Sequence, residues 1–258
     1  MICAIIQARM SSSRLPGKVL LEVNGRPLLS YMLERISKAS TIDRVVVATS
    51  TESADDQIEM FCRRENVSCY RGSLDDVLDR YYHAALHVNC DVVVRLTSDC
   101  PLLDPAVIDE VVKVYQSRRH DYVANTVPPG GTFPDGMDVE VFSLQALEKA
   151  WKEARKPSER EHVTFYFWKN SELFSTYRYD LQDNLSKYRL TVDYPEDFEV
   201  IQAVLTELYQ QNTLFTLKDI INYLEAHPGI IDKNKKIVPN QGWLPALEKD
   251  IGAGFLSE

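Results

Sequence analysis

The residues best suited to anion chemistry stand together near the start of the chain, in the string QARMSSSRLPGKVL at positions 7–20. Arg9, Arg14 and Lys18 share this stretch with three serines and one glycine, and no acidic residue precedes Glu22. Arginine grips phosphate oxygens through two parallel hydrogen bonds, lysine adds a compact charge, and small residues let backbone N–H groups approach. The stretch therefore predicts a polyphosphate site, with a solvated basic loop as the alternative.

The position of this stretch in the chain favours the phosphate interpretation. It follows the apolar run Ile2–Ile6, which predicts a short buried strand. Ligands of open parallel sheets bind beyond the carboxyl ends of the strands. Two common phosphate motifs are excluded, because Val19 stands where a Walker A loop has serine or threonine, and because the stretch lacks the dinucleotide fingerprint G-x-G-x-x-G.

Two aspartates each follow an apolar run and stand shortly before a proline. Asp99 precedes Pro101, and Asp193 precedes Pro195. Mg²⁺ prefers carboxylate oxygens together with phosphates and waters, so two carboxylates at neighbouring strand ends would suit a magnesium ion that carries a nucleotide. Taken singly, each aspartate is more commonly a helix N-cap or a turn residue. Asp197 is interpreted as a carboxylate stabilised by the N-terminus of the next helix.

Further polar residues stand where a substrate would meet them. Asp138 and Glu140 are two apart in a predicted strand and so share one face, where a metal or sugar hydroxyls would partner them. The alternative is a solvent-facing edge strand. Arg95 lies inside an apolar strand and needs a partner if it is buried. The loop that holds Arg71 and Ser73 is a candidate border of the nucleotide base.

Three basic residues of the second half are substrate-site candidates that also have ordinary structural explanations. Arg160 and His162 stand near a predicted helix start, where His162 would contact the substrate or act as a base. The alternative for His162 is a hydrogen-bonded structural histidine. Arg189 would pair with a carboxylate or reach a phosphate, and its alternative is an ion pair with Asp193 or Glu196.

The elements that must position these residues alternate between apolar strands and amphipathic helices. The strands expected in the first half are Ile2–Ile6, Arg44–Ser50, Ser68–Arg71 and Asp91–Thr97. The helices expected between them are Leu28–Lys38, Asp55–Glu65, Asp75–Val88, and one from Pro105 to about Arg118. Continuously apolar strands predict an α/β fold, in which a mainly parallel, mixed sheet is sandwiched by helices.

The pattern loosens after this half. Residues 127–138 are rich in proline and glycine and predict a loop. The strands expected beyond it are Met137–Phe142, Phe174–Asp180 and Tyr188–Val192. The helices expected there are one from a Ser143 cap to Glu153, Glu161–Asn170, Glu196–Tyr209, and one from a Thr216 cap to Glu225. The tail from Ile230 has weak patterning.

Composition bounds the class of protein. The 258 residues carry a net charge of −9, which argues against a general nucleic-acid binder because such a protein needs a basic face. Five cysteines without a C-x-x-C pair indicate a reduced, cytoplasmic protein without structural disulfides. The N-terminal apolar run is too short for a signal peptide, and no apolar stretch approaches a membrane span, so we expect no membrane partner.

Several longer strings add a family resemblance. The basic stretch closely resembles the signature loop, A-R-x-x-S-x-R-L-P-G-K, of the cytidylyltransferases that activate sialic acid and KDO, and most of all the subgroup associated with spore coat polysaccharide biosynthesis. The likeness continues in the same order through RGSLDDVLDRYY at 71–82, RLTSDCPL at 95–102, FPDGMDVEVF at 133–142, REHVT at 160–164 and RLTVDYPEDF at 189–198. It implies the nucleotide-diphospho-sugar transferase fold, of the GT-A, Rossmann-like kind.

The resemblance also implies an activity. It implies a Mg²⁺-dependent, homodimeric cytidylyltransferase that transfers CMP from CTP to a sugar acid of the nonulosonic or KDO kind and releases pyrophosphate, for surface polysaccharide or glycan biosynthesis. It gives the catalytic roles to Lys18, Arg14 and Arg9. The nucleotide contacts that it implies are Gln7, Ala8, Arg9, Ser13, Arg14, Lys18, Arg71, Ser73 and Arg95. The substrate contacts are Asp138, Arg160, His162 and Arg189, and the metal ligands are Asp99 and Asp193.

Other functions stay open on the sequence alone. A sugar-1-phosphate nucleotidyltransferase that uses another nucleotide would have the same phosphate-binding groups. A glycosyltransferase would need a D-x-D motif, which the string TSDCP lacks. A non-catalytic nucleotide-binding protein is the third alternative.

The chain departs from the KDO enzymes at one motif. Ser98-Asp99-Cys100-Pro101 stands where those enzymes have Gly-Asp-Glu-Pro, so the second acid is missing and sugar specificity does not transfer. The segment after Tyr209 extends beyond the shorter sialic-acid-type domains. We therefore expect a catalytic domain over residues 1–209 and a helical extension over residues 210–258 that packs on the same domain.

Overall fold

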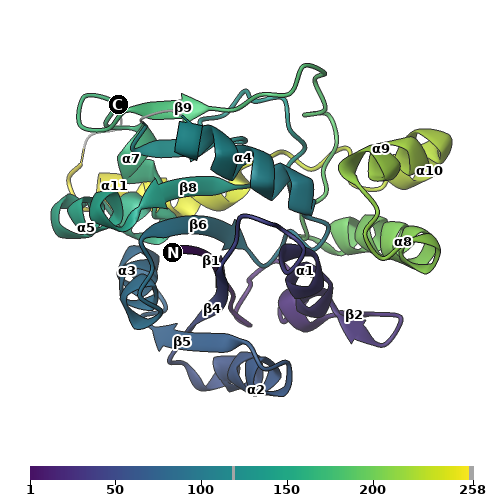
Figure 1. Cartoon of the computed structure of the whole chain (residues 1–258), viewed down its shortest axis with the longest axis horizontal. Helices are drawn as coiled ribbons and strands as arrows, with labels where there is room; N and C mark the ends of the chain where they lie inside the picture. The colour runs from purple at the N-terminus through teal and green to yellow at the C-terminus, as the bar shows by residue number, and fades with distance from the viewer. Residues whose placement is uncertain (118–119, 256–258) are drawn as a thin grey trace.

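A seven-stranded mixed sheet forms the centre of the computed structural model, which describes residues 1–117 and 120–255 (Figure 1). The strands are β1 (Ile2–Gln7), β4 (Arg44–Ser50), β5 (Ser68–Gly72), β6 (Val92–Thr97), β7 (Tyr122–Ala124), β8 (Glu140–Ser143) and β9 (Thr176–Arg178). Their order is β5-β4-β1-β6-β8-β7-β9, and β8 runs antiparallel to both of its neighbours. The predicted mainly parallel, mixed α/β sheet is confirmed.

Helices cover both faces of the sheet, because successive residues of each central strand point to opposite sides. In β1, Ala4 and Ile6 join one buried apolar cluster, while Cys3 and Ile5 join the other. The first cluster includes residues of α1 (Leu28–Ile36), α2 (Asp56–Arg64), α4 (Pro105–Ser117), α8 (Pro195–Gln211) and α9 (Leu217–Ala226). The second includes residues of α3 (Val77–His87), α5 (Leu144–Glu153) and α7 (Phe165–Trp168).

Some predicted elements differ from the structure. The predicted strand Tyr188–Val192 is wrong: this segment forms only an isolated bridge, because the Leu190 amide bonds to the Asp135 carbonyl at 2.6 Å and the Val192 amide bonds to the Asp99 carbonyl at 2.8 Å. Its amides therefore pair with two different loops instead of one strand. The short hairpin β2 (Glu22–Val23) and β3 (Arg26–Pro27) and the strand β7 were not predicted.

The predicted helix Glu161–Asn170 is divided in two. The structure has α6 (Pro157–His162) and α7, and Val163 between them has a φ of +51°, which no continuous right-handed helix allows. The helix predicted from Pro105 ends at Ser117 in the structure, and its predicted last residue, Arg118, lies outside the described residues.

The C-terminal extension was expected to be helical, but the weak patterning of the tail did not predict its individual helices. It forms α10 (Pro228–Ile231), the 3-10 turn η3 (Gln241–Trp243) and α11 (Leu244–Gly252). The helix α11 packs against α6 through Asp250, which accepts hydrogen bonds from the Ser158 amide and hydroxyl. The boundary at residue 209 stays a prediction. Within the described ranges, every helix is too short or too polar to cross a membrane.

Candidate active site

A pocket of about 590 Å³ opens where β1 and β6 end. Its walls come from the basic loop after β1, the loop before β8 and a segment of the C-terminal tail. Most of the residues predicted for a site line it, although they are far apart in the chain. These are Gln7, Ala8, Arg9, Ser13, Arg14, Lys18, Arg95, Asp99, Asp138, Glu140, His162, Arg189 and Asp193.

The basic loop is held in shape by backbone contacts. The Gly17 amide donates to the Met10 carbonyl at 2.9 Å, and the Met10 amide donates to Asp55 at 2.7 Å. Gly17 has a φ of +70°, a conformation that favours glycine. Arg9 is exposed at the pocket and has no hydrogen bond or ion pair with another group in the part of the chain that the structure describes. The loop therefore presents at least one cation that is free to meet an anion.

Lys18 joins the two aspartates that were predicted to bind a metal. Its buried ammonium donates to Asp99 and Asp193 at 2.8 Å each, and to the Val192 carbonyl at 2.7 Å. Burial opposes a charge on Lys18, but the two carboxylates outweigh it and raise the pKa of the ammonium. Burial likewise opposes charge on Asp99 and Asp193, and Lys18 outweighs it and lowers the pKa of both carboxyls. The site thus contains two ionised carboxylates that converge on one cation.

Asp193 also forms ion pairs with two arginines from different segments of the chain. Arg14 reaches it at 2.6 Å and lies 5.3 Å from the centre of the Tyr194 ring. Arg189 reaches it at 3.3 Å and grips Asp197 at 2.8 and 3.0 Å. The predicted alternative of an ion pair between Arg189 and Asp193 is therefore present.

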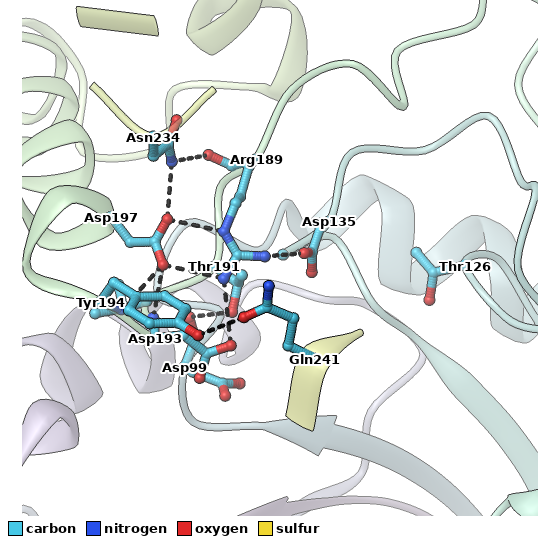
Figure 2. Close-up of polar contacts among 12 residues, drawn as sticks. Asp99, Thr126, Asp135, Arg189, Thr191, Asp193, Tyr194, Asp197, Asn234 and Gln241 are labelled. Atoms are coloured by element: carbon cyan, nitrogen blue, oxygen red, sulfur yellow. Dashed lines mark hydrogen bonds and ion pairs between the residues drawn. The ribbon is translucent and has the colours of Figure 1, made fainter. Parts of the chain in front are cut away.

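Asp197 organises the start of α8, as the sequence predicted. It is fully buried and accepts hydrogen bonds from the Asp193 and Tyr194 amides at 3.0 Å each. Figure 2 shows it at the centre of a network with Arg189 and Asn234. Since Asp197 binds Arg189 and positions Asp193 together, it fixes the geometry of the site without lining the pocket.

Arg95 and Glu140 form a buried pair in the pocket wall. Arg95 has an ion pair with Glu140 and donates to Gln7 at 3.1 Å, while the Tyr122 hydroxyl donates to Glu140 at 2.5 Å. The alternative of a solvent-facing edge strand for Glu140 is wrong, because β8 lies between β6 and β7. The charge of Arg95 is compensated within the protein, so its role toward a nucleotide stays a prediction.

Asp138 lies in a cluster of acids whose pKa values are raised by burial. It accepts from Thr126 at 2.6 Å and from the Gly136 amide at 2.7 Å. Burial raises the pKa of Asp138, and burial together with Asp138 raises the pKa of Asp135 to about 7. Asp138 and Asp135 both line the pocket, so hydroxyl groups of a substrate can reach this cluster.

His162 is a neutral group with free hydrogen-bonding capacity. Burial, followed by the nearby charge of Arg95, lowers the pKa of His162 to about 3. Its buried Nε2 atom has no hydrogen-bond partner among the described residues. The ring stacks on Phe165 at 4.7 Å and lies 6.4 Å from Trp243. The structural explanation of a hydrogen-bonded histidine therefore does not account for Nε2.

Three predicted contacts lie outside the pocket. Arg71 bonds to Glu59 at 2.8 Å and turns toward α2, and the Ser73 hydroxyl accepts from the Asp76 amide at 3.0 Å. Arg160 donates to the Asp76 carboxylate at 3.0 Å. The structure does not bring these three residues together with the others, because each is engaged by neighbours of its own.

Sequence reasoning also missed residues that line the pocket. Arg80 of α3 is buried there, and residues 238–243 form part of the wall. A signal existed for Arg80, which stands three positions after Val77 and so falls on the apolar face of α3. The tail segment offered no comparable signal, since its sequence has no helical or strand periodicity.

Comparison with known proteins groups the chain with one kind of enzyme. A family model described as cytidylyltransferase matches residues 3–221. The spore coat polysaccharide biosynthesis protein SpsF of Bacillus subtilis is 30% identical over 237 residues, which cover 88% of this chain and 95% of that protein. A 3-deoxy-manno-octulosonate cytidylyltransferase of Geobacter metallireducens is 36% identical over 111 residues, which are 43% of each. The structure of a cytidylyltransferase from Leptospira borgpetersenii matches with a TM-score of 0.84 at 38% identity, covering 92% of this chain and 98% of that one.

Proposed function

The chain belongs to the cytidylyltransferase family, and from that premise we propose that it transfers CMP from CTP to a sugar acid. A hydroxyl oxygen of the sugar forms a bond to the α-phosphorus, the bond to the β-phosphate oxygen breaks, and pyrophosphate leaves while the hydroxyl proton passes to solvent. The sugar-acid class rests on the relatives, because one acts on 3-deoxy-manno-octulosonate and another belongs to spore coat polysaccharide biosynthesis. Cytoplasmic location and a homodimer belong to the same proposal and rest on the family resemblance.

The observation that carries the proposal is the convergence of Lys18, Asp99 and Asp193 beside Arg14, with Arg9, which has no partner among the described residues, at the same pocket. Phosphoryl transfer depends mainly on positioning and on neutralising charge. Arg9 binds a phosphate without losing an internal partner, whereas Arg14 and Lys18 exchange a carboxylate for a phosphate oxygen. These cations stabilise the charge that builds on the leaving pyrophosphate.

The residues present fit a magnesium ion. Asp99 and Asp193 already direct one oxygen each at a single cation, the Lys18 ammonium, at 2.8 Å. The described residues contain no cluster of three or more His, Cys, Asp or Glu side chains that could hold a metal ion. The protein would therefore supply two carboxylates, and phosphates and water would supply the remaining ligands. Asp99 and Asp193 would hold the ion, and when bound it supplies charge for the phosphate oxygens.

On the substrate side, we assign Asp138 and His162. Asp138 lies beside the pocket with its carboxyl held by Thr126, and His162 offers a neutral nitrogen to a hydroxyl or carboxyl of the sugar. The missing second acid at Cys100 leaves the identity of the sugar to experiment.

Thermal shifts with CTP, UTP, GTP and ATP, each with and without Mg²⁺, test the nucleotide. A ligand at about 100 times its dissociation constant adds roughly 2.7 kcal/mol of stability, which a melting curve resolves. We expect a Mg²⁺-dependent shift with CTP, followed by pyrophosphate release when a panel of sugar acids is added. A shift with another nucleotide, with pyrophosphate release from a sugar phosphate, would replace this proposal with a sugar-1-phosphate nucleotidyltransferase. No shift with any nucleotide would leave a non-enzymatic function.

A further inference from the structure

Residues 234–250, which we name the C-terminal strap, cross the open side of the pocket. Six consecutive residues of the strap, 238–243, line the pocket together with Arg14, His162 and Tyr194. No motif in the sequence marks this segment, and the family model ends before it, at residue 221. Its place in the wall therefore calls for an account of its own.

Buried polar contacts fix the strap at both ends. Asn234, which is 3% exposed, donates to the Arg189 carbonyl at 3.0 Å and to Asp197 at 2.9 Å. Asp250, which is 7% exposed, accepts from Ser158 at 2.6 and 2.8 Å. One end is thus tied to the arginine network beside the reaction centre, and the other is tied to the helix that carries His162.

The middle of the strap is held more lightly. Residues 238–241 are exposed, and the Tyr194 hydroxyl donates to the Gln241 side chain at 2.8 Å on the surface (Figure 2). Exposed hydrogen bonds of this kind compete with water and contribute little net stability. A segment with firm ends and a lightly held middle can move without unfolding the protein.

The inner surface of the strap touches the phosphate-binding group. A Cβ atom placed on Gly242 would lie 3.5 Å from Nη1 of Arg14, so a side chain at this position would contact the guanidinium. Trp243 lies edge-on to Phe165 at 4.9 Å and beside His162. The strap therefore contacts one predicted phosphate ligand and one predicted substrate ligand at the same time.

Unpartnered buried atoms occur at the same place. Nε of Arg14 and Nε2 of His162 have no hydrogen-bond partner in the described part of the chain. Buried polar atoms in native proteins are nearly always paired, so exceptions call for a ligand or water. Nε of Arg80 and Nε of Arg95, which line the same pocket, also have no partner among the described residues, so the pocket that the strap borders offers several unpaired donors to a polar ligand.

We propose that the C-terminal strap is the outer wall of the nucleotide site and closes over the bound triphosphate, with Gly242 and Trp243 as positioning residues for Arg14 and His162. This inference rests on the proposed function, because it takes a nucleoside triphosphate as the ligand. Because Gly242 has no side chain, it leaves room for the Arg14 guanidinium to turn from Asp193 to a phosphate. Closure of the strap keeps water from the reacting phosphorus.

A graded series at Gly242 tests the strap. Gly242→Leu places a side chain against Arg14, and we expect it to raise the dissociation constant of the Mg²⁺-nucleotide by about tenfold or more. Gly242→Ala, whose Cβ makes only ordinary contact, weakens binding less. Gly252→Leu is the matched control, because no described residue has an atom within 4 Å of a Cβ placed on Gly252, and Gly252 is not among the residues that line the pocket. Calorimetric titration measures each constant with whichever of CTP, UTP, GTP and ATP the wild type binds.

Hydrogen exchange of the wild type gives an independent measurement that does not depend on the folding of a variant. Nucleotide and Mg²⁺ should slow exchange across residues 238–243 and leave α10 unchanged. Unaltered exchange in the strap, or wild-type affinity in Gly242→Leu, would overturn the proposal that the strap closes over the nucleotide. Either result would leave the proposed function standing. A wild type that binds none of the four nucleotides overturns both.

Discussion

Replacing Lys18 with methionine keeps the apolar part of the side chain at nearly the same length and removes the ammonium group, so it isolates what the ammonium does. In the folded protein Lys18 is 8% exposed and is the shared partner of Asp99 and Asp193. Removing one member of a buried ion pair costs about 3–5 kcal/mol, because the remaining charges lose their compensation. Arg14 remains on Asp193, so we expect the lower part of that range at pH 8.

The pH dependence of this loss separates charge from packing. In the wild type, the pKa values of Asp99 and Asp193 are lowered, so their stabilisation is present above their unfolded pKa values and is lost as the pH falls below them. In Lys18→Met two carboxyls share a buried site without their cation, and one pKa rises. Relative to the wild type, the variant should therefore regain stability as the pH falls from 8 toward 5, because the other groups that titrate in this range, His162 and Asp135, are present in both proteins.

Urea denaturation of both proteins at several pH values measures this difference. Lys152→Met is the control, because Lys152 makes an ion pair with Glu148 that is exposed to solvent and contributes little to stability. Mg²⁺ without nucleotide should stabilise Lys18→Met more than the wild type, since the two carboxylates are then free for a cation. Turnover should fall by a factor of about 30 to 1,000, which corresponds to roughly 2–4 kcal/mol of transition-state stabilisation. A loss of stability that is the same at pH 5 and pH 8, without a response to Mg²⁺, would refute the reasoning.

Three further predictions follow from other parts of the site. Asp99→Asn keeps the shape of the carboxyl and removes its charge, so the thermal shift with CTP should lose most of its dependence on Mg²⁺; a full dependence would remove Asp99 from the metal site. Gly136→Ala should lower the free energy of unfolding, measured in urea, by about 2–4 kcal/mol, because φ is +101° and a Cβ would lie 2.3 Å from the Leu190 carbonyl carbon. Gly229→Ala serves as the control, because no described residue has an atom within 4 Å of a Cβ placed there. His162→Gln should reduce the loss of folding stability at acidic pH. The pKa of His162 is lowered to about 3 in the folded protein, so its contribution to the free energy of unfolding is present above the unfolded pKa near 6.5 and is lost as the pH falls toward 3. Identical stability curves for this variant and the wild type between pH 7 and pH 4 would contradict the burial of a neutral imidazole.

The first half of the fold was predictable because each central strand is apolar on both faces. In β1, Cys3 and Ile5 pack on one side of the sheet while Ala4 and Ile6 pack on the other, so residues 3–6 include no polar residue. This pattern requires helices on both faces and a parallel arrangement. The basic loop could be placed at the carboxyl edge for the same reason, since it directly follows the first such strand.

Sequence could not decide which basic residue meets which acid. Arg71 and Arg95 look alike in the sequence, yet Arg71 turns to Glu59 on α2 while Arg95 pairs with Glu140 across two antiparallel strands. The choice depends on which strand lies beside which, and β8 is inserted between β6 and β7 against chain order. The strap was hidden for a related reason: its conformation is imposed by anchors at Asn234 and Asp250, and its own residues have little periodic preference.

The charge balance at the centre of the pocket explains why cation and nucleotide should bind together. Asp193 forms ion pairs with Lys18, Arg14 and Arg189, and Lys18 also forms one with Asp99. The positive charges nearest the reaction centre are therefore already compensated by carboxylates. A triphosphate that recruits Lys18 leaves two buried carboxylates uncompensated, which is costly unless another cation takes the place of the ammonium. Binding of a divalent cation between the carboxylates and binding of phosphate by Lys18 must therefore favour each other by the same factor. Arg9, which has no partner among the residues that the structure describes, carries no such penalty, and we expect a nucleotide to engage the site first through it.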